Sequence, residues 1–407
     1  MTTLSQPTTW TNWVGNQSFS PRTIIEVHFE AEIQQHVAQA AAQGRGVRTY
    51  GTGHSFTPIV ETAVLLNTAT LNGIINIDPQ TRFVTALPKT QIGEFGEPLW
   101  AVGLSLANQG DIDTQAIAGA IATATHGSGH TLPSFSASLK RTRLVDGLGN
   151  LVEIDASMPD ELAAVQTSIG LLGIMTELTI EAVPAYELHQ THQILPFDEM
   201  LNRFDEYMDA YRSFTFFWCP TDQSVELFGF SGAKADDCFL RLFRHPAPDL
   251  DRTFLPPNER VGPAYRVFPT VYEPNFHEME YFLPLDQAHD ILTEMRKLML
   301  RWLPTSIYPM EIRNVAAEEA WMSPHYRRNN LVVSVCGEPG TNYWDYFRAC
   351  DSLFAEFRGR PHWGKLHFMT ADRLDRLFPH YNDFVTMRRR FDPKGIFLNK
   401  HTRALFA

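Results

Sequence analysis

Three charged side chains in the second half of the chain have the types and spacing to act on a hydroxyl group. Glu311 and Arg313 stand two positions apart in a segment that reads as a strand, where alternation places both on one face. Lys365 follows in the short run 362–365. Taken alone, these residues are more typical of an exposed strand pair and of a solvated surface lysine. Held together in a dry pocket, such fixed charges would strongly stabilise a developing anion.

Two segments of small residues in the first half indicate a nucleotide cofactor. The first, 51–56, has two glycines and follows a short strand, as a phosphate-binding loop would. It fits neither the dinucleotide fingerprint nor the P-loop pattern, so by itself it is more typical of a plain turn. The second spans 117–129 and holds nothing larger than Ile and His. Small side chains let backbone N–H groups approach a ligand, and the two segments together favour a nucleotide over tight packing alone.

The elements that must position these residues fall into two parts. Up to Pro184 the chain reads as an α/β unit. We expect helices over 30–44 and 92–102, strands at 47–50, 64–67, 73–77, 83–86 and 175–183, and a hairpin over 143–154. After Pro184 the sequence becomes rich in aromatic residues, and an amphipathic helix spans 286–303. This second part reads as an α+β domain on an antiparallel sheet.

Composition excludes several classes of protein. A chain of 407 residues has room for two domains, and its net charge of −12 disfavours nucleic acid and anionic membrane surfaces as partners. It has no apolar stretch long enough to span a membrane, and the first 13 residues lack a signal-peptide pattern. The cysteines, Cys219, Cys238, Cys336 and Cys350, form no CxxC pair. We therefore expect free thiols, no metal site and a cytoplasmic protein.

Several motifs, taken in order, resemble the sugar-1,4-lactone and alditol oxidases, which are flavoproteins of the vanillyl-alcohol-oxidase type. They are Gly-x-Gly-His-Ser at 51–55, Ile-Ala-Gly-x(5)-Thr-His-Gly-Ser-Gly at 117–129, Glu-x-Arg at 311–313, His-Trp-Gly-Lys at 362–365 and Asp-Pro-x-Gly-x-Phe at 392–397. The resemblance runs from Trp13 to about Leu405 and is weakest in the middle of the second part. It implies an α+β protein of two domains. These are a PCMH-type FAD-binding domain over 1–184 and an antiparallel-sheet substrate (cap) domain over 185–360. A C-terminal segment, 361–407, returns to the FAD domain and the active site.

The resemblance implies FAD as cofactor and assigns its contacts. They are Gly51, Thr52, Gly53, His54 and Ser55 in the first loop, Gly119, Thr125, His126, Gly127 and Ser128 in the second, Gly110 and Asp111 beside the flavin ring, and Gly173 and Ile174 on the adenine side. His54 matches the position where many relatives bond histidine covalently to the flavin 8α-methyl group. A neutral imidazole nitrogen is a competent nucleophile for this bond. We expect covalent FAD through His54 and no second, cysteinyl bond, because no cysteine precedes Cys219.

The resemblance also gives the charged residues their roles. Arg313 and Lys365 would polarise the substrate hydroxyl and stabilise the reduced flavin, and Glu311 would bind a sugar hydroxyl and position Arg313. His367 lies two positions after Lys365 and could share its face, which makes it a further candidate for the substrate site.

The implied reaction is oxidation of the C2 hydroxyl of a sugar 1,4-lactone, such as L-gulono-, L-galactono- or D-arabinono-1,4-lactone. Hydride passes to flavin N5, and O2 is reduced to H2O2. Three alternatives stay open: an alditol oxidase acting on xylitol or sorbitol, a lactone dehydrogenase that reduces a carrier, and a non-catalytic flavin- or carbohydrate-binding protein. The last would need no pocket cations, so Glu311, Arg313 and Lys365 speak against it. The sequence leaves the sugar, its stereochemistry and the oligomeric state open.

Three positions support or depart from the interpretation as a lactone oxidase. Asp111 stands where alditol oxidases carry serine, which favours a lactone. Gly110 matches a position that gates O2 in relatives, where oxidases often have glycine and dehydrogenases alanine; the alternative is that it only allows a turn before Asp111. Relatives have a small glycine-rich turn near residue 87, whereas this chain has Pro88 and Lys89. Because proline lacks an N–H, a cofactor contact there could be lost or replaced.

Overall fold

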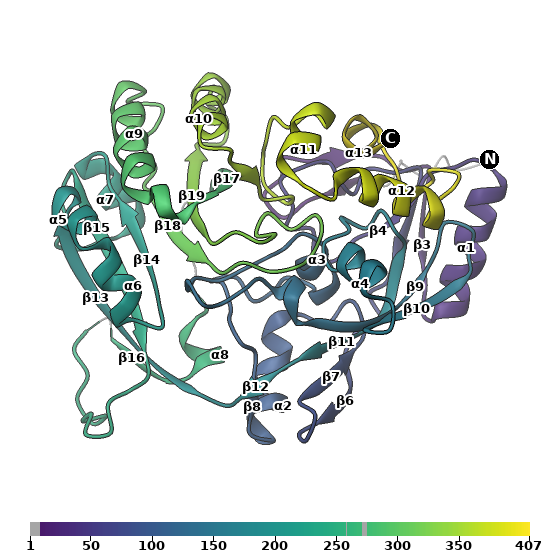
Figure 1. Ribbon diagram of the computed structural model, residues 1–407, viewed down its shortest axis with the longest axis horizontal. Helices are drawn as coiled ribbons and strands as arrows, with labels where there is room; N and C mark the ends of the chain where they lie inside the picture. Colours follow the sequence, from purple (N-terminus) through teal and green to yellow (C-terminus); the bar gives the residue numbers. More distant parts are fainter. Residues whose placement is uncertain (1–8, 258, 271–274) are drawn as a thin grey trace, which may run out of the picture.

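Two lobes, built from different parts of the chain, form the computed structural model (Figure 1). It describes residues 9–257, 259–270 and 275–407; the first eight residues, which hold most of the segment considered for a signal peptide, lie outside the described residues. Strands β3 (Thr23–Glu26), β5 (Val64–Asn67) and β4 (Val47–Thr49) form a parallel sheet in the N-terminal lobe. Helix α1 (Glu30–Ala42) covers it with Ile33, Val37 and Ala40, the apolar face expected from their spacing.

A second sheet of the N-terminal lobe is antiparallel. Its strands, in order, are β10 (Leu151–Asp155), β9 (Leu139–Val145), β11 (Ile174–Glu181), β7 (Phe83–Ala86) and β6 (Ile74–Asp78). The shorter elements are β1 (Trp10–Thr11), β2 (Ser18–Phe19), β8 (Leu104–Ser105), β12 (Val183–Pro184), α3 (Ile117–Ala122), η2 (Phe135–Ser138) and α4 (Pro159–Val165). The helix expected over 92–102 is instead a 3-10 turn, η1 (Ile92–Phe95), followed by α2 (Gly96–Ala101). Pro98 has no N–H and is tolerated only in a first helical turn, so the helix restarts just before it.

The second lobe is built on one antiparallel sheet of eight strands. In order they are β16 (Arg260–Pro263), β13 (Glu187–Pro196), β15 (Asp237–Arg244), β14 (Ser213–Trp218), β18 (Met310–Val315), β19 (Asn330–Gly337), β17 (His277–Pro284) and β20 (Arg360–Pro361). Its helices are α5 (Phe197–Asn202), α6 (Phe204–Ala210), α7 (Asp222–Phe228), α8 (Ala264–Val267), η3 (Leu285–Gln287), α9 (Ala288–Arg301) and α10 (Trp344–Glu356). Helix α9 is the amphipathic helix expected over 286–303.

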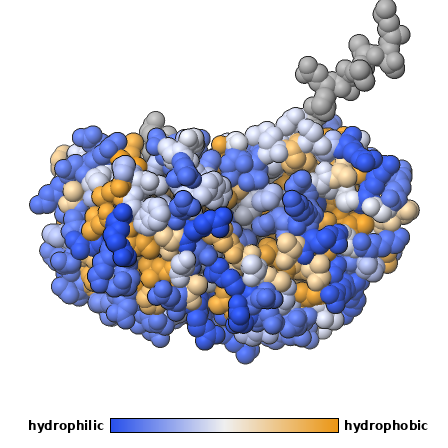
Figure 2. Space-filling view, turned by 90° about the horizontal axis from the view of Figure 1, so that it is seen from above, coloured by the Kyte–Doolittle hydropathy of each residue, from blue (hydrophilic) through white to orange (hydrophobic). Residues whose placement is uncertain are grey.

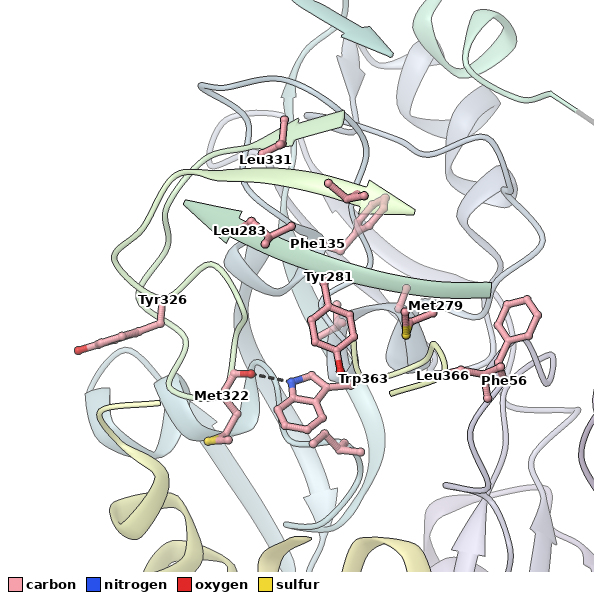
Figure 3. Packing of buried hydrophobic residues seen from close by; sticks show 14 of the residues in the cluster. Phe56, Phe135, Met279, Tyr281, Leu283, Met322, Tyr326, Leu331, Trp363 and Leu366 are labelled. Atoms are coloured by element: carbon pink, nitrogen blue, oxygen red, sulfur yellow. Dashed lines mark hydrogen bonds between the residues drawn. The ribbon is translucent and has the colours of Figure 1, made fainter. Parts of the chain in front are cut away.

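The two faces of this sheet differ in character. On β17, Met279 and Tyr281 point into the apolar core, where Tyr281 lies near Trp363 (Figure 3). Because side chains alternate along a strand, Glu278 and Glu280 point to the opposite face, toward the N-terminal lobe. The same alternation on β18 buries Ile312 in the core and leaves its charged neighbours on the other face. The eight-stranded sheet is therefore apolar on its helix-covered side and charged on the side that closes the site.

The C-terminal helices α11 (Ala371–Leu377), α12 (Tyr381–Phe391) and α13 (Lys400–Phe406) return to the N-terminal lobe. The backbone N–H of Val47 donates to the carbonyl of Ile396 at 3.0 Å, and the Arg48 guanidinium donates to that of Phe397 at 2.5 Å. Asp392 accepts from the N–H groups of Ile396 and Phe397 at 2.9 and 2.8 Å. The Asp-Pro-x-Gly-x-Phe motif is thus a turn that attaches the C-terminal segment beside β4.

The surface is mainly hydrophilic, with smaller hydrophobic patches between charged side chains, as Figure 2 shows for one face. Within the described ranges, no helix combines the length and the apolar character needed to cross a membrane.

Candidate active site

A long cleft of about 1160 Å³, counted out to its solvent opening, lies between the two segments of small residues. At Gly51, an added Cβ would lie 2.8 Å from the Cβ of Ala116, so only glycine lets the two segments approach this closely. Gly53 has φ +74°, a left-handed conformation that favours glycine. At Gly119 an added Cβ would meet nothing within 4 Å, which shows that this position faces open space. Backbone N–H groups that no side chain covers can bind the pyrophosphate of a dinucleotide such as FAD.

Most of the predicted cofactor residues line this cleft. They are Gly51, Thr52, Gly53, His54, Ser55, Gly119, Thr125, Gly173 and Ile174. Lys89 holds the first loop at the place where relatives were expected to have a glycine-rich turn. Its ammonium donates to the carbonyls of Tyr50 at 3.2 Å and Gly51 at 2.7 Å. The carbonyl of Pro88 accepts from the N–H of Ala118 at 3.2 Å and so joins this turn to the second small-residue segment.

The His54 side chain projects from the first loop toward the active-site end of the cleft. Its Nδ1 lies 2.8 Å from the Thr52 hydroxyl, its Nε2 lies 3.3 Å from the Thr114 hydroxyl, and its ring stacks on Trp13 at 5.2 Å. Burial, followed by the charge of Lys365, lowers the pKa of His54 to about 4. The imidazole is therefore neutral near pH 7, the state in which a ring nitrogen can act as a nucleophile.

A second cleft joins the first at four residues that line both, namely Gln115, Thr125, His362 and Lys365. It encloses about 760 Å³ between the N-terminal lobe and the charged face of the eight-stranded sheet. Gly110 and Asp111 line it from the N-terminal lobe. The sheet contributes Glu278, Glu280, Glu311, Arg313, Phe217 and Cys336, with Phe228 and Phe276 from adjoining segments. A flavin ring at the junction would face this second cleft, which is therefore the candidate substrate pocket.

The structure brings the predicted charged residues together and holds each in an ion pair. Arg313 pairs with Glu311 at 2.5 Å and with Asp111 at 3.1 Å. Asp111 also pairs with Arg241 of β15 at 2.7 Å. Asp111 therefore orients Arg313 from the other lobe. The sequence predicted Asp111 beside the flavin ring and did not predict this role.

Lys365 pairs with Glu278 of β17, and its ammonium also lies 4.9 Å from the centre of the Phe56 ring. Burial lowers the pKa of Lys365, but Glu278 and Glu280 more than offset this, so the pKa lies above its usual value and the lysine stays charged. The turn that presents Lys365 is anchored by Trp363, which is buried and donates from Nε1 to the carbonyl of Met322 at 2.7 Å (Figure 3).

Glu311 is a buried carboxyl group of this pocket whose pKa lies well above its usual value. Burial raises its pKa to about 7, with Arg313 opposing and Asp111, Glu278 and Glu280 adding to the rise. It can therefore change charge near neutral pH. As a carboxylate it can accept a hydrogen bond from a hydroxyl group, and as a carboxylic acid it can donate one.

The sequence reasoning missed Glu278, Glu280, Ser334, Arg241 and His362. A signal for the first two was available, because the segment 277–284 alternates glutamates with apolar residues in an otherwise buried strand. Two buried carboxylates on one face of a strand need partners, and such partners gather at functional sites. Ser334 and Arg241 carry no comparable signal, since their roles depend on which strands become neighbours in the sheet.

Three of the predicted residues lie away from both clefts in the described structure. Gly127 lines a separate cavity, and Ser128 donates to the carbonyl of Phe214 and so ties the N-terminal lobe to β14. His367 packs against Trp363 and His401 and accepts from the N–H of Met369 at 3.3 Å. The run after Trp363 is a turn and not a strand, so residues 365 and 367 do not share a face.

His126, Glu280 and His362 place ligand-type atoms within 4.8 Å of one another. Each already has a partner in the protein: His126 Nε2 lies 3.1 Å from Glu280, and His362 Nδ1 accepts from the N–H of Gly364 at 2.9 Å. Because His362 Nδ1 is an acceptor, the neutral ring carries its proton on Nε2. Burial lowers the pKa of His362 to about 3, with Lys365 and His126 adding to the decrease and Glu280 opposing it.

Comparison with known proteins agrees with this geometry. The fold matches that of cholesterol oxidase from Brevibacterium sterolicum with a TM-score of 0.84 over 98% of this chain and 96% of that one, at 14% identity. A family model described as FAD binding domain matches residues 21–155, and one described as D-arabinono-1,4-lactone oxidase matches 239–405. The fold and the two family models thus define the class of the protein as an FAD-dependent oxidoreductase.

Relatives of similar length identify the family. An L-gulono-1,4-lactone dehydrogenase from Mycobacterium tuberculosis is 33% identical over 97% of this chain and 98% of its own. An alditol oxidase from a Streptomyces species is 28% identical over 97% of this chain and 98% of its own. An L-gulonolactone oxidase from Scyliorhinus torazame is 25% identical over 97% of each chain. The chain belongs to the family of FAD-linked aldonolactone and alditol oxidoreductases, and the fold class and family predicted from the motifs are confirmed.

Proposed function

We propose that this protein oxidises the C2 hydroxyl of a sugar 1,4-lactone, of the L-gulono, L-galactono or D-arabinono type, and passes the electrons to O2. The observation that carries the proposal is the junction of the two clefts, where Lys365 and the Glu311–Arg313 pair converge on the place of the flavin ring. Bound FAD supplies the hydride acceptor. The protein's own residues bind the sugar, hold its hydroxyl and exclude water.

The pocket walls suit a compact ring. Phe217, Phe228 and Phe276 offer apolar surface for the C–H faces of a sugar, while Glu311 and Arg313 meet its hydroxyl groups. Arg313 and Lys365 stabilise negative charge as it develops on the substrate oxygen and at the flavin. Asp111 holds Arg313 in place from the opposite wall. Because alditol oxidases carry serine at this position, its identity supports a lactone over an alditol.

A panel of sugars tests the substrate class. Under anaerobic conditions the yellow colour of the purified holoenzyme should bleach rapidly with one of the three lactones and slowly with xylitol or sorbitol. Rapid bleaching by an alditol alone would replace the lactone with the second candidate, an alditol oxidase. An anaerobic sample without added sugar serves as the control for non-specific reduction.

The acceptor is a separate part of the proposal. Gly110 lines the substrate pocket without a Cβ and so leaves the approach to the flavin open, which supports an oxidase. The similarity to a protein named as a dehydrogenase favours the alternative, in which a carrier and not O2 takes the electrons. Mixing the reduced enzyme with air-saturated buffer decides between them: reoxidation with H2O2 formation supports the oxidase, and reoxidation by an acceptor dye alone supports the dehydrogenase.

We also propose that FAD is attached covalently through His54. The support is a neutral imidazole held by two hydroxyl groups at the active-site end of the cofactor cleft. After acid precipitation, yellow colour should stay with the pellet of the wild-type protein and leave that of His54→Ala. Colour released from the wild type would contradict the covalent bond and leave FAD binding intact.

A cytoplasmic location without nucleic-acid or membrane partners completes the proposal. Its support is the net charge of −12 and the four unpaired cysteines, which suit a reducing compartment.

A further inference from the structure

The hairpin of β1 and β2 lies directly on the first cofactor loop. At Gly53, an added Cβ would lie 3.3 Å from the Trp10 ring and 3.7 Å from the Cα of Asn12. Residues 12–17 also donate hydrogen bonds to four consecutive carbonyl groups of the loop. They run from the Trp13 N–H to Gly53 at 3.1 Å, from the Trp13 indole to His54 at 3.1 Å, from the Asn12 amide to Ser55 at 3.0 Å, and from the Asn16 and Gln17 amides to Phe56 at 2.9 Å each. One short segment therefore holds the backbone of the loop from this side.

Trp13 contacts both the backbone and the side chain of His54. Its indole N–H donates to the His54 carbonyl, and its ring stacks on the imidazole with the ring centres 5.2 Å apart and the planes at 27°. The indole in turn meets Phe56 at 5.9 Å and Phe276 at 6.3 Å, both in edge-to-face contacts. Phe276 comes from the other lobe and lines the second cleft. Trp13 is thus packed between the cofactor loop and the cap lobe, with one face on the imidazole.

The stack fixes the direction in which His54 can react. The lone pair of a neutral imidazole nitrogen lies in the plane of the ring, and rotation of that plane about the Cβ–Cγ bond is only weakly restricted in an isolated side chain. The hydroxyls of Thr52 and Thr114 hold the ring at its two nitrogens, and Trp13 holds it by its face. Trp10 lines the cofactor cleft, whereas Trp13 lines neither cleft. Trp13 therefore acts on a bound cofactor through His54.

We propose that Trp13 is a positioning residue for the covalent attachment of FAD, because it sets the ring plane of His54. The proposal rests on the proposed bond between His54 and the flavin 8α-methyl group. Forming that bond breaks one methyl C–H bond and the imidazole N–H bond and joins the nitrogen to the carbon. The two hydrogens leave as protons, and two electrons remain on the flavin until O2 takes them up, with two protons, as H2O2. The nitrogen must point at the methyl carbon, so the rate of this step depends on the orientation of the ring.

The competing explanation is that Trp13 only stabilises the fold around the loop. In that case its loss would lower the melting temperature or the amount of FAD bound, and the bound flavin would still become attached at the normal rate. If Trp13 orients His54, its loss slows attachment while FAD still binds, because the other walls of the cofactor cleft are unchanged. The rate of attachment, measured beside the FAD content, separates the two explanations.

Three variants test the role of the stacked ring. Trp13→Leu removes the flat ring together with the indole N–H. Trp13→Phe keeps a flat ring against His54 and loses the N–H. Trp344→Leu is the matched control, since Trp344 on α10 is 43% exposed, as is Trp13, and packs against Phe347 and Phe368.

The experiment starts from full-length protein produced under riboflavin limitation, to which FAD is added in air at about pH 8, where even an exposed imidazole is neutral. Samples taken over time are precipitated with acid, and flavin is measured in the pellet and in the supernatant. Because a displacement of about 1 Å can cost about 100-fold in rate, attachment in Trp13→Leu should be at least about tenfold slower than in the wild type. Trp13→Phe should stay within about threefold of the wild type, and Trp344→Leu should match it.

Total bound flavin and the melting temperature establish that each variant is folded and loaded with FAD. If Trp13→Leu fails this check, Trp13→Gln replaces it with the same expectation, since its amide can still donate to the His54 carbonyl. Attachment in a loaded Trp13→Leu within about threefold of the wild-type rate would overturn the role of Trp13. Equal slowing in Trp13→Phe would assign the effect to the N–H and overturn the role of the stack. Wild-type flavin that stays in the supernatant would instead refute the covalent bond to His54, and the role of Trp13 with it.

Discussion

Replacing Glu311 with glutamine should change how the stability of the protein depends on pH. The Glu311 carboxyl group is buried beside Asp111, Glu278 and Glu280, and only 14% of the side chain is exposed. Burial and these neighbours raise its pKa from 4.5 to about 7 against the opposing charge of Arg313. Glutamine has nearly the same shape and does not titrate, so Glu311→Gln removes the pH-dependent contribution of this position, together with its charge pair to Arg313.

The size and sign of the effect follow from the raised pKa of Glu311. Below pH 4.5 the carboxyl group is protonated in both the folded and the unfolded chain, and the stabilising contribution is fully present. Between 4.5 and about 7 the folded chain keeps a proton that the unfolded chain has released, so the free energy of unfolding falls as pH rises. The total loss is about 3 kcal/mol, because a tenfold difference in proton affinity corresponds to about 1.4 kcal/mol.

Equilibrium unfolding in urea at several values between about pH 5 and pH 8 measures this loss. Across that range, the free energy of unfolding of the wild type should fall by roughly 2–3 kcal/mol relative to that of Glu311→Gln. Glu294→Gln, on the exposed side of α9, is the control and should leave the pH dependence of the wild type unchanged. A gap that changes by less than about 1 kcal/mol, or in the opposite direction, would refute the placement of Glu311 in a desolvated site.

Lys365→Met should slow anaerobic flavin reduction about 10²–10³-fold, and Lys365→Arg should not rescue it, since a planar fork replaces a point charge. A stopped-flow rate within about threefold of wild type would place this lysine away from the flavin. Gly110→Ala puts a Cβ 3.0 Å from the carbonyl of His126, at a φ outside the left-handed region. It should slow reoxidation by O2 and leave reduction unchanged; loss of both rates would mean that the backbone has shifted. Lys89→Met removes two hydrogen bonds to the first loop and should lower the ratio of bound FAD to protein in absorbance spectra, whereas an unchanged ratio would contradict its role.

Local patterns predicted the elements that position the site. The spacing of Ile33, Val37 and Ala40 identified α1, and the apolar periodicity of 286–303 identified α9, because both helices bury one face against a sheet. Alternation on β18 correctly placed Glu311 and Arg313 on one face. These predictions depend only on residues close together in the chain.

Local patterns could not predict features that depend on contacts between residues far apart in the chain. Glu278 became part of the site because β17 lies next to β19, which brings Ser334 beside it, and no spacing in the sequence encodes that neighbour. His367 was expected on the face of Lys365, but the chain turns after Trp363 to bury that ring, and the tertiary contact overrides the alternation. The Asp111 pair with Arg313 likewise joins residues about 200 positions apart and arises only from the docking of the two lobes.

The attachment of residues 396 and 397 beside β4 has a consequence for biosynthesis. Strand β4 leads into the cofactor loop, but the hydrogen-bond partners of Val47 and Arg48, Ile396 and Phe397, lie about 350 positions later in the chain. The N-terminal lobe therefore cannot complete its packing until residues 396 and 397 have been translated. A chain that stops before residue 396 would lack both of these bonds, one of which fixes the side chain of Arg48 at the wall of the dinucleotide cleft.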